Sequence, residues 1–401
     1  VHKNTNYFNL KSYLCKKYLS KPMIMKKITL FALVALLITA CAPKSYPEFE
    51  KDLNAFREEI GNIGLGVAVV KDNKIIYDNY FGVKNIETGE KVDAQTIFRI
   101  ASISKSFTST SLMQMVEQGK VTLETDVSDL MGFQVRNPKF PETIITLEML
   151  LSHTSSLNDS QGYFTLDVIN PATNPDCAAC YNEYEPGKGY QYCNLNFNMA
   201  GTILEKLSGE RFDQYVVNHI LNPLGLYGGY NIDELDSTRF ATLYSYNSEN
   251  DSLEAQPNAY KSRAEEIANY VTGYSTPIFS PTGGMKISTT DLAKYMMMHM
   301  NYGLYPGVQE RIISEESSKN MQTPRSDDEH YGLALWRNTD YIPEVELVGH
   351  TGGAYGLRSA MFFHPEEKYG FIVISSGAKT SEEGLLKGMI KIMYDHFIAN
   401  E

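Results

Sequence analysis

Tryptophan, cysteine and basic residues are scarce in this chain of 401 residues. It contains one tryptophan and five cysteines, and its 36 lysines and arginines stand against 48 aspartates and glutamates. Seven of the lysines lie in residues 1–40, which hold no acidic residue, so the rest of the chain carries 29 basic and 48 acidic residues. Because proteins bind nucleic-acid phosphates through basic patches, this acidic balance argues against a nucleic acid as partner.

Several hydrolase and metalloenzyme motifs are also missing. The chain has no G-x-S-x-G, which carries the nucleophile of α/β-hydrolases, and neither H-x-H-x-D nor H-E-x-x-H, which are typical of zinc enzymes. We therefore expect no metal and no other cofactor. The composition, with 43% hydrophobic and 21% charged residues and no visible repeat, is that of a globular protein with a sizeable core.

The N-terminal segment predicts export. Residues 25–27 give a positively charged start, 28–40 form an apolar run of thirteen residues, and Cys41 follows a small residue. Such a run is too short for a membrane-spanning helix and fits the core of a signal peptide. Cys41 resembles the acylated cysteine of bacterial lipoproteins; the alternative is an ordinary signal peptide. We expect the protein to be lipid-anchored to the bacterial cell envelope, on the periplasmic or outer-membrane face.

The remaining cysteines, apart from Cys15, lie within seventeen residues of one another, at Cys177, Cys180 and Cys193. Export to an oxidising compartment permits a disulfide among them and leaves one thiol over. A zinc site would need a fourth ligand, and no histidine lies nearby in the sequence.

Hydrophobic periodicity predicts strands near both ends of the mature chain and helices between them. Two hairpins are expected, at 65–70 with 74–81 and at 358–364 with 369–375, and helices are expected at 48–60, 103–118, 147–153, 198–207, 289–300 and 385–399. Strands at both ends imply an α/β fold in which distant segments form one sheet, with a mostly helical lobe inserted at about 140–280. A cleft between the two lobes is a natural place for a ligand.

The expected organisation therefore has four parts. We predict an over-extended start at 1–24, a lipoprotein signal peptide at 25–40, a tether at 41–47 and one catalytic domain at 48–400.

Ser102 and Lys105 form the sharpest local feature. A serine hydroxyl is a poor nucleophile until a base removes its proton, and residues three apart on a helix share a face. Lys105 can therefore reach the Ser102 oxygen. It can act as the base provided that burial keeps its amine partly neutral. The S-x-x-K pattern alone is weak evidence, because Ser376 and Lys379 match it too, at the end of a strand.

Two further motifs follow along the chain. Tyr192 and Asn194 can relay a proton and hold a carbonyl group. Residues 349–353 (GHTGG) lie beside a predicted strand, where glycines let a substrate approach the backbone closely. A backbone N–H group there, together with that of Ser102, can form an oxyanion hole.

In this order the motifs resemble class C β-lactamases and the wider set of penicillin-binding proteins, D-peptidases and esterases, whose signature is S-x-x-K, Y-x-N and K/H-T-G. The resemblance runs over about residues 50–398. It includes the stretches 98–107 (FRIASISKSF), 150–157 (LLSHTSSL), 223–225 (PLG), 281–284 (PTGG) and 288–291 (STTD).

The resemblance implies a β-lactamase/transpeptidase-like fold, in which an antiparallel sheet is flanked by helices, and no metal. It implies that Ser102 is acylated, that Lys105 is its base partner and that Tyr192 carries the proton to the leaving group. The substrate-binding residues that it implies are Asn194, His350, Thr351, Gly352 and Gly353, with the N–H groups of Ser102 and Gly353 as the oxyanion hole.

One departure bears on the substrate. His350 stands where β-lactamases and many D,D-peptidases have lysine, and an imidazole is mostly neutral at pH 7. This weakens the case for penicillin turnover. We therefore expect a serine hydrolase that acts on esters, D-amino-acid peptides or related amides. The alternatives are a true class C-type β-lactamase or D,D-peptidase and a catalytically silent sensor. His153 is expected to be a packed structural residue.

Overall fold

The computed structural model describes residues 46–326, 329–380 and 382–399. The predicted over-extended start, the predicted signal peptide, Cys15 and the predicted lipidation site Cys41 lie outside these residues. The chain divides into Val1–Glu48 and Phe49–Glu401, and the fold below is that of the second unit. In the described part of the chain no helix combines the length and the apolar character needed to cross a membrane.

In the described residues the long strands lie near both ends of the domain, and most of the elements between them are helices. The strands are β1 (Gly64–Lys71), β2 (Lys74–Gly82), β3 (Ile97–Arg99), β4 (Gly228–Gly229), β5 (Tyr244–Asn247), β6 (Ser252–Ala255), β7 (Lys286–Ser288), β8 (Trp336–Asn338), β9 (Leu347–Ala354), β10 (Leu357–His364) and β11 (Tyr369–Ser375). The helices are α2 (Pro47–Glu59), α3 (Ser104–Glu117), α4 (Val127–Met131), α5 (Leu147–Leu151), α6 (Asn194–Ser208), α7 (Phe212–Val216), α8 (Asn222–Leu224), α9 (Ala264–Ala268), α10 (Thr289–Met300), α11 (Glu315–Met321) and α12 (Glu382–Phe397).

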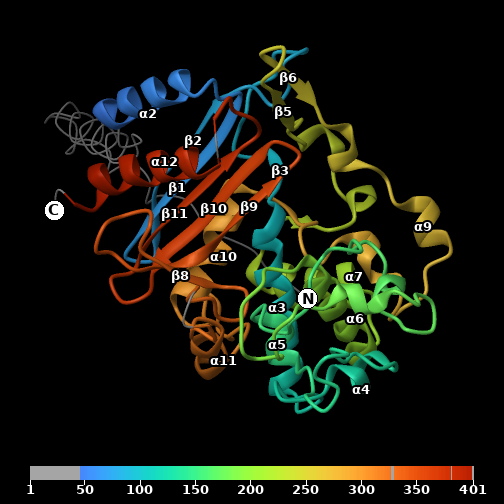
Figure 1. The fold of residues 1–401 in the computed structure, drawn as a ribbon. Coiled ribbons are helices and arrows are strands. Elements are labelled where there is room, and N and C mark those ends of the chain that lie inside the picture. The colour runs from blue at the N-terminus through green and yellow to red at the C-terminus, as the bar shows by residue number, and fades with distance from the viewer. Residues whose placement is uncertain (1–45, 327–328, 381, 400–401) are drawn as a thin grey trace, which may run out of the picture. The chain divides into compact units, whose positions relative to one another are not determined.

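One antiparallel sheet of six strands joins the two ends of the domain, in the order β2-β1-β11-β10-β9-β8. β1 pairs with β11 from Leu65 opposite Ser375 to Lys71 opposite Tyr369, so the N-terminal hairpin and the last strands lie side by side (Figure 1). β11 is buried along its whole length and β1 along nearly all of it, as expected for central strands rich in valine and isoleucine. The predicted α/β sheet built from distant segments is confirmed.

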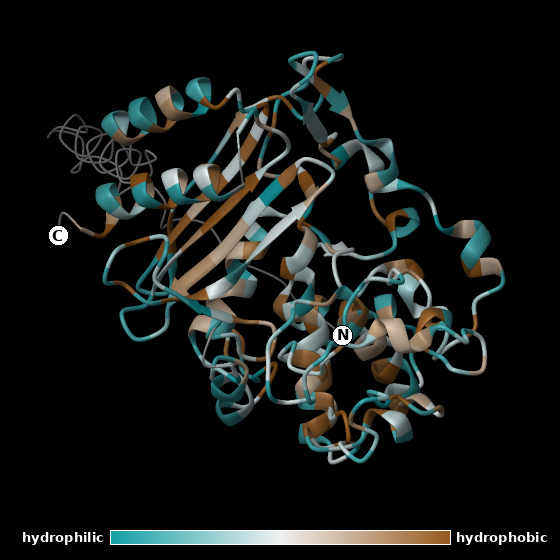
Figure 2. Cartoon of the chain, in the orientation of Figure 1, coloured by the Kyte–Doolittle hydropathy of each residue, from teal (hydrophilic) through white to brown (hydrophobic). Residues whose placement is uncertain are grey.

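Helices cover both faces of this sheet. α2 and α12 pack against each other through the ring pair Phe49–Phe397, with centroids 4.9 Å apart, and α12 lies on β10 and β11. α10 packs on β1, β10 and β11 from the opposite face (Figure 1). The strands between these layers are largely hydrophobic, whereas α2 and α12 carry many hydrophilic residues (Figure 2). Burial of one stripe per helix therefore holds the layers together.

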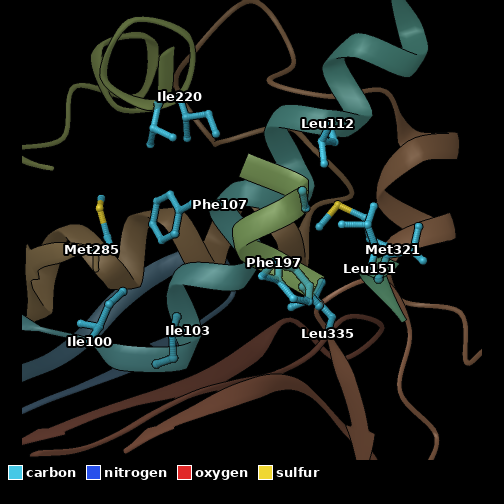
Figure 3. Packing of buried hydrophobic residues seen from close by; sticks show 14 of the residues in the cluster. Ile100, Ile103, Phe107, Leu112, Leu151, Phe197, Ile220, Met285, Met321 and Leu335 are labelled. Atoms are coloured by element: carbon cyan, nitrogen blue, oxygen red, sulfur yellow. The ribbon is translucent and has the colours of Figure 1, made fainter. Parts of the chain in front are cut away.

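The helical region lies beside this layered part and packs on α3, which contacts α6 and α7. Figure 3 shows apolar side chains of α3, α6 and the neighbouring segments, among them Phe107, Leu112 and Phe197, in one buried cluster. α5 to α9 fall within the predicted helical lobe, and the hydrophobic core continues from the lobe to the sheet. α3 is thus fixed from both sides, and the residues that precede it are held at the junction.

Most predicted elements lie within a few residues of their observed bounds, and α10 matches them at both ends. Two expectations need correction. α6 begins at Asn194 rather than at residue 198, because a carboxylate from a distant loop caps its first turn, as described below. Residues 349–353 lie inside β9 rather than beside a strand, because these glycine-rich residues pair with β10 in regular register.

Candidate active site

Ser102 lies on a short 3₁₀ turn, Ala101–Ile103, that leads directly into α3. Ala101 adopts a φ of +46°, a left-handed conformation that costs energy in a residue with a Cβ atom. The sharp turn leaves Ser102 half-exposed at the start of the helix, while its neighbours Ala101 and Ile103 are buried. The helix macrodipole there favours negative charge on the serine oxygen.

Lys105 is buried beneath this turn, with no exposed surface. Its Nζ atom lies 3.0 Å from Ser102 Oγ, 3.0 Å from Asn194 Oδ1 and 3.0 Å from the carbonyl oxygen of Thr282. Burial lowers the pKa of Lys105 to about 7, although nearby Asp159 acts in the opposite direction. The amine is therefore partly neutral at physiological pH.

The three partners of Lys105 match the hydrogen-bonding capacity of a neutral amine. The Asn194 and Thr282 oxygens can only accept hydrogen bonds, so they take the two N–H groups. The charged amine also donates to Ser102 Oγ, whereas in the neutral amine the lone pair faces this oxygen and the serine hydroxyl can donate its proton. The contact therefore has the distance that proton transfer between the two groups requires.

Tyr192 and Asn194 reach the same place from the start of α6. Lys105 Nζ lies 4.6 Å from the centroid of the Tyr192 ring, and the two residues bracket the base. Two of the three motifs therefore meet at one lysine amine, although Lys105 and Asn194 are 89 residues apart in the sequence.

Asp159 is a site residue that the motifs did not identify. Its carboxylate accepts hydrogen bonds from the backbone N–H groups of Asn194 (2.8 Å) and Leu195 (2.9 Å), and from Asn194 Nδ2 (2.9 Å). Because a carboxylate only accepts hydrogen bonds, Asp159 holds the Asn194 amide with Nδ2 toward itself and Oδ1 toward Lys105. It also caps α6 with a negative charge. No local pattern marks Asp159, since it lies in an irregular loop 35 residues away.

Thr282 is the second residue of this kind. Its carbonyl oxygen accepts from Lys105, and its hydroxyl donates to Asn194 Oδ1 at 2.8 Å. The stretch 281–284 resembles the family, but nothing in its residue types predicts that a backbone oxygen is the important group.

The predicted glycine-rich motif brings β9 against the turn that carries Ser102. β8 pairs with β9 only from Leu347 to Gly349, so the following residues of β9 have no partner strand on that side among the described residues. A Cβ atom on Gly352 would lie 2.2 Å from the carbonyl oxygen of Ile100, so only glycine permits this approach. Gly353 then lines the same cavity as Ser102, as an oxyanion hole requires.

This cavity has a volume of about 380 Å³. Its lining residues are Arg99, Ala101, Ser102, Tyr163, Phe164, Tyr192, Asn194, Ser280, Thr282, Gly283, Gly353, Ala354 and Tyr355. A larger cavity of about 560 Å³ is lined by Thr351 and Trp336 but not by Ser102 or Tyr192, and we therefore place the chemistry in the smaller one. Thr351, predicted to bind substrate, faces this second cavity.

His350 is buried, with 1% of its surface exposed, and does not line the cavity. Its Nδ1 atom lies 2.5 Å from the carbonyl oxygen of Thr351 and its Nε2 atom 3.0 Å from the hydroxyl of Tyr331. Burial, followed by the nearby Lys105, lowers the pKa of His350 to about 3. The imidazole is therefore neutral over the physiological range and supplies no positive charge.

His153 is buried behind the site, as predicted for a structural residue. Its Nδ1 atom accepts the backbone N–H of Cys193 at 3.1 Å, and its ring lies 4.3 Å from that of Tyr192. It thus supports the chain immediately before Asn194.

The disulfide that the sequence permits is not formed among the described residues. Cys177, Cys180 and Cys193 are all free thiols. The Cys193 sulfur lies 3.2 Å from Asp159 Oδ1 and the Cys180 sulfur lies 3.3 Å from the carbonyl oxygen of Val168, so each thiol is directed at its own oxygen acceptor. Proximity in the sequence is therefore not enough to pair these cysteines.

Comparison with known proteins gives a consistent result at the level of sequence. Protein flp of Staphylococcus aureus strain MW2 is 24% identical over 328 residues, which cover 78% of this chain and 59% of that protein. Penicillin-binding protein 4 of Amycolatopsis lactamdurans is 27% identical over 289 residues, which cover 70% of each chain. The match therefore spans less than two thirds of the length of Protein flp.

Solved structures share the fold. The octameric penicillin-binding protein homologue from Pyrococcus abyssi aligns with a TM-score of 0.70 and 24% identity over 87% of this chain and 77% of its own. EstCE1, a hydrolase with promiscuous acyltransferase activity, aligns with a TM-score of 0.67 and 20% identity over 86% and 97% of the two chains. The family model described as Beta-lactamase matches residues 49–390. Because that match covers most of the sequence, this chain belongs to the Beta-lactamase family.

Proposed function

We propose that this protein is a serine hydrolase that forms an acyl-enzyme on Ser102. The observation that carries the proposal is the contact between Lys105 and Ser102, in which the Nζ atom of a buried amine, whose pKa is lowered to about 7, lies 3.0 Å from the serine oxygen. An amine with this pKa is poised to exchange protons at physiological pH.

Acylation follows from this geometry. Lys105 takes the proton of Ser102, and the serine oxygen forms a bond to the carbonyl carbon of the substrate. The carbonyl oxygen becomes negative and is stabilised by the N–H groups of Ser102 and Gly353. The bond to the leaving group then breaks as the proton is delivered to it through Tyr192. Attack of water on the acyl-enzyme reverses these proton movements, releases the acid and restores Ser102.

The neutral His350 favours esters, D-amino-acid peptides or related amides in the cell envelope over penicillins. A β-lactamase or D,D-peptidase of the class C type, the runner-up, would hold the carboxylate of its substrate with a cation at this position. Here the position is buried, uncharged and outside the cavity. The complete set of Ser102, Lys105 and Tyr192 argues against a silent sensor.

The direct test is intact-mass analysis after exposure to a broad serine-reactive phosphonate, combined with turnover of p-nitrophenyl esters and D-amino-acid amides. We expect one adduct per chain on Ser102, and we expect Ser102→Ala to lose both the adduct and the turnover. Ser376→Ala is the matched control, because Ser376 belongs to the second S-x-x-K pattern but is a buried residue that directly follows β11 in the chain. A wild-type protein that never gains the adduct would be a binding protein rather than a hydrolase.

The envelope location remains a proposal that rests on the sequence alone. We propose that the signal peptide is cleaved between Ala40 and Cys41 and that Cys41 is acylated. The lipid alone would then tether the enzyme to the membrane. Metabolic labelling with a fatty acid tests this. Label is expected in the wild type and not in Cys41→Ala, and equal label in both would exclude the anchor.

A further inference from the structure

A third cavity, smaller than the two described above, adjoins the cavity that Ser102 lines. Its volume is about 40 Å³, and the two cavities share Arg99, Phe164, Ser280 and Tyr355 as lining residues. A space of this size holds more than one water-sized group, which is enough for a carboxylate. The smaller cavity therefore lies directly beside a substrate bound at Ser102.

Four cationic residues line this smaller cavity: Arg99, Lys261, Arg263 and Lys286. No aspartate or glutamate is among its lining residues. This is unusual in a chain whose acidic residues outnumber its basic residues by twelve. We call these four residues and the space between them the basic pocket.

Three of the four cations have no carboxylate partner among the described residues. Lys286 is 5% exposed, and its Nζ atom donates a hydrogen bond to the carbonyl oxygen of Tyr230 at 2.6 Å. Arg99 donates to the carbonyl oxygens of Gly283 (2.8 Å) and Ala259 (3.3 Å). Both side chains retain N–H groups that no described acceptor occupies.

The carboxylates near the basic pocket already have hydrogen-bond or ion-pair partners. Asp213 binds Arg211 in a salt bridge of 2.6 Å, and Glu266 binds Arg263 at 2.9 Å. Asp233 accepts from the hydroxyl of Ser262 and from a backbone N–H group. Among the four cations of the basic pocket, only Arg263 is therefore paired with a carboxylate of the described residues.

Two of these cations act on Lys286. Burial first, and then the neighbouring Arg99 and Arg263, lower the pKa of Lys286 well below its ordinary value, while Asp213 and Asp233 act in the opposite direction. Buried charges without partners cost stability, and proteins rarely keep them unless a ligand or a function compensates. An anion in the basic pocket would satisfy the free N–H groups and remove the repulsion.

We propose that the basic pocket binds a carboxylate carried by the substrate, so that the enzyme prefers acidic acyl substrates to neutral ones. This rests on the proposed acyl transfer to Ser102, because the basic pocket adjoins that cavity. The charge for recognising the substrate thus comes from β3, β7 and the segment before α9, whereas the position of His350 on β9 provides none.

The test uses pairs of esters that have the same shape but differ in charge. In one series, p-nitrophenyl half-esters of dicarboxylic acids of increasing length are each compared with the neutral ester that has an isopropyl group in place of the carboxylate. In the other, butyrate esters of hydroxybenzoates are compared with those of the matching isopropylphenols. The first series places the charge in the acyl part, the second in the leaving group.

We expect the wild type to prefer the acid in at least one series, measured as the ratio of kcat/KM for acid and neutral ester. Lys286→Met should lower this ratio about tenfold or more while leaving turnover of the neutral ester unchanged, since hydrogen bonds to charged groups contribute in this range. Lys261→Gln changes an exposed residue and should lower the ratio several-fold even if Lys286→Met fails to fold. Lys120→Gln is the control, because it removes an unpaired charge beyond the far end of α3.

The outcomes separate the two proposals. Turnover of neutral esters without any preference for acids, or a preference that survives both pocket variants, overturns the basic pocket alone. An equal fall of the ratio in Lys120→Gln also overturns it, because the effect would then reflect net charge. Absence of turnover with every ester overturns the proposed hydrolase, and the basic pocket as a substrate site with it.

Discussion

The hydroxyl of Tyr331 donates a hydrogen bond to Nε2 of His350 across 3.0 Å. The other ring nitrogen lies against the carbonyl oxygen of Thr351, which can only accept, so Nδ1 carries the proton and Nε2 is the acceptor. Both side chains are buried. The position that is lysine in β-lactamases is therefore built here for a neutral ring.

His350→Lys should not create β-lactam turnover. The ammonium would be enclosed beside Lys105 and Tyr331 without a carboxylate, and the free energy of unfolding should fall by about 3 kcal/mol or more. Nitrocefin hydrolysis and urea unfolding measure the two effects. Tyr331→Phe is the control, because it removes only the hydroxyl and should cost about 1–3 kcal/mol. A stable His350→Lys enzyme that cleaves nitrocefin would contradict this account.

The activity should depend on the protonation of Lys105. The neutral amine is the active form, so kcat/KM should be constant above pH 7 and fall about tenfold per pH unit below it, as protonation removes the lone pair. Lys105→Met should lower kcat/KM by about a hundredfold or more and abolish this limb of the profile. The pH dependence of ester hydrolysis measures both, and an unchanged limb in the variant would assign it to another group.

Asp159 should position the base as well as cap α6. Its negative charge raises the pKa of Lys105, so Asp159→Asn should move the acidic limb of the pH profile below pH 7. Loss of the charged cap should also lower the free energy of unfolding by about 1 kcal/mol. Asp126→Asn removes the carboxylate cap of α4 and should cost stability without moving the limb. Equal pH profiles in the two variants would reduce Asp159 to a structural cap.

Gly352→Ala should impair acylation. The added Cβ would lie 2.2 Å from the carbonyl oxygen of Ile100 and 2.5 Å from Ser359 Oγ, so β9 must move away from the turn of Ser102 and carry Gly353 with it. Loss of one oxyanion donor typically costs about a hundredfold or more in kcat. Gly229→Ala is the control, because its Cβ has no neighbour closer than 3.8 Å. Single-turnover acylation distinguishes the two, and equal rates would show that β9 tolerates the methyl group.

The sequence predicted those parts of the fold that local chemistry controls. Both hairpins carry β-branched residues around short turns, and α10 has a serine cap at Ser288, so their bounds follow from the chain itself. The start of α6 did not follow, because its cap is Asp159, 35 residues before Asn194. The cysteines show the same limit, since closeness in sequence does not set the direction of a sulfur.

What the sequence determined by itself is the set of reactive side chains and the order in which they occur. Ser102 and Lys105 are three residues apart at the start of α3, and that spacing alone brings the amine to the hydroxyl. Only the tertiary structure decided how these groups behave. Burial lowers the pKa of Lys105, Asp159 orients Asn194, and Tyr331 holds His350 as a neutral ring. The physical reason is that desolvation and hydrogen bonding depend on neighbours in space, which the packing of distant segments supplies.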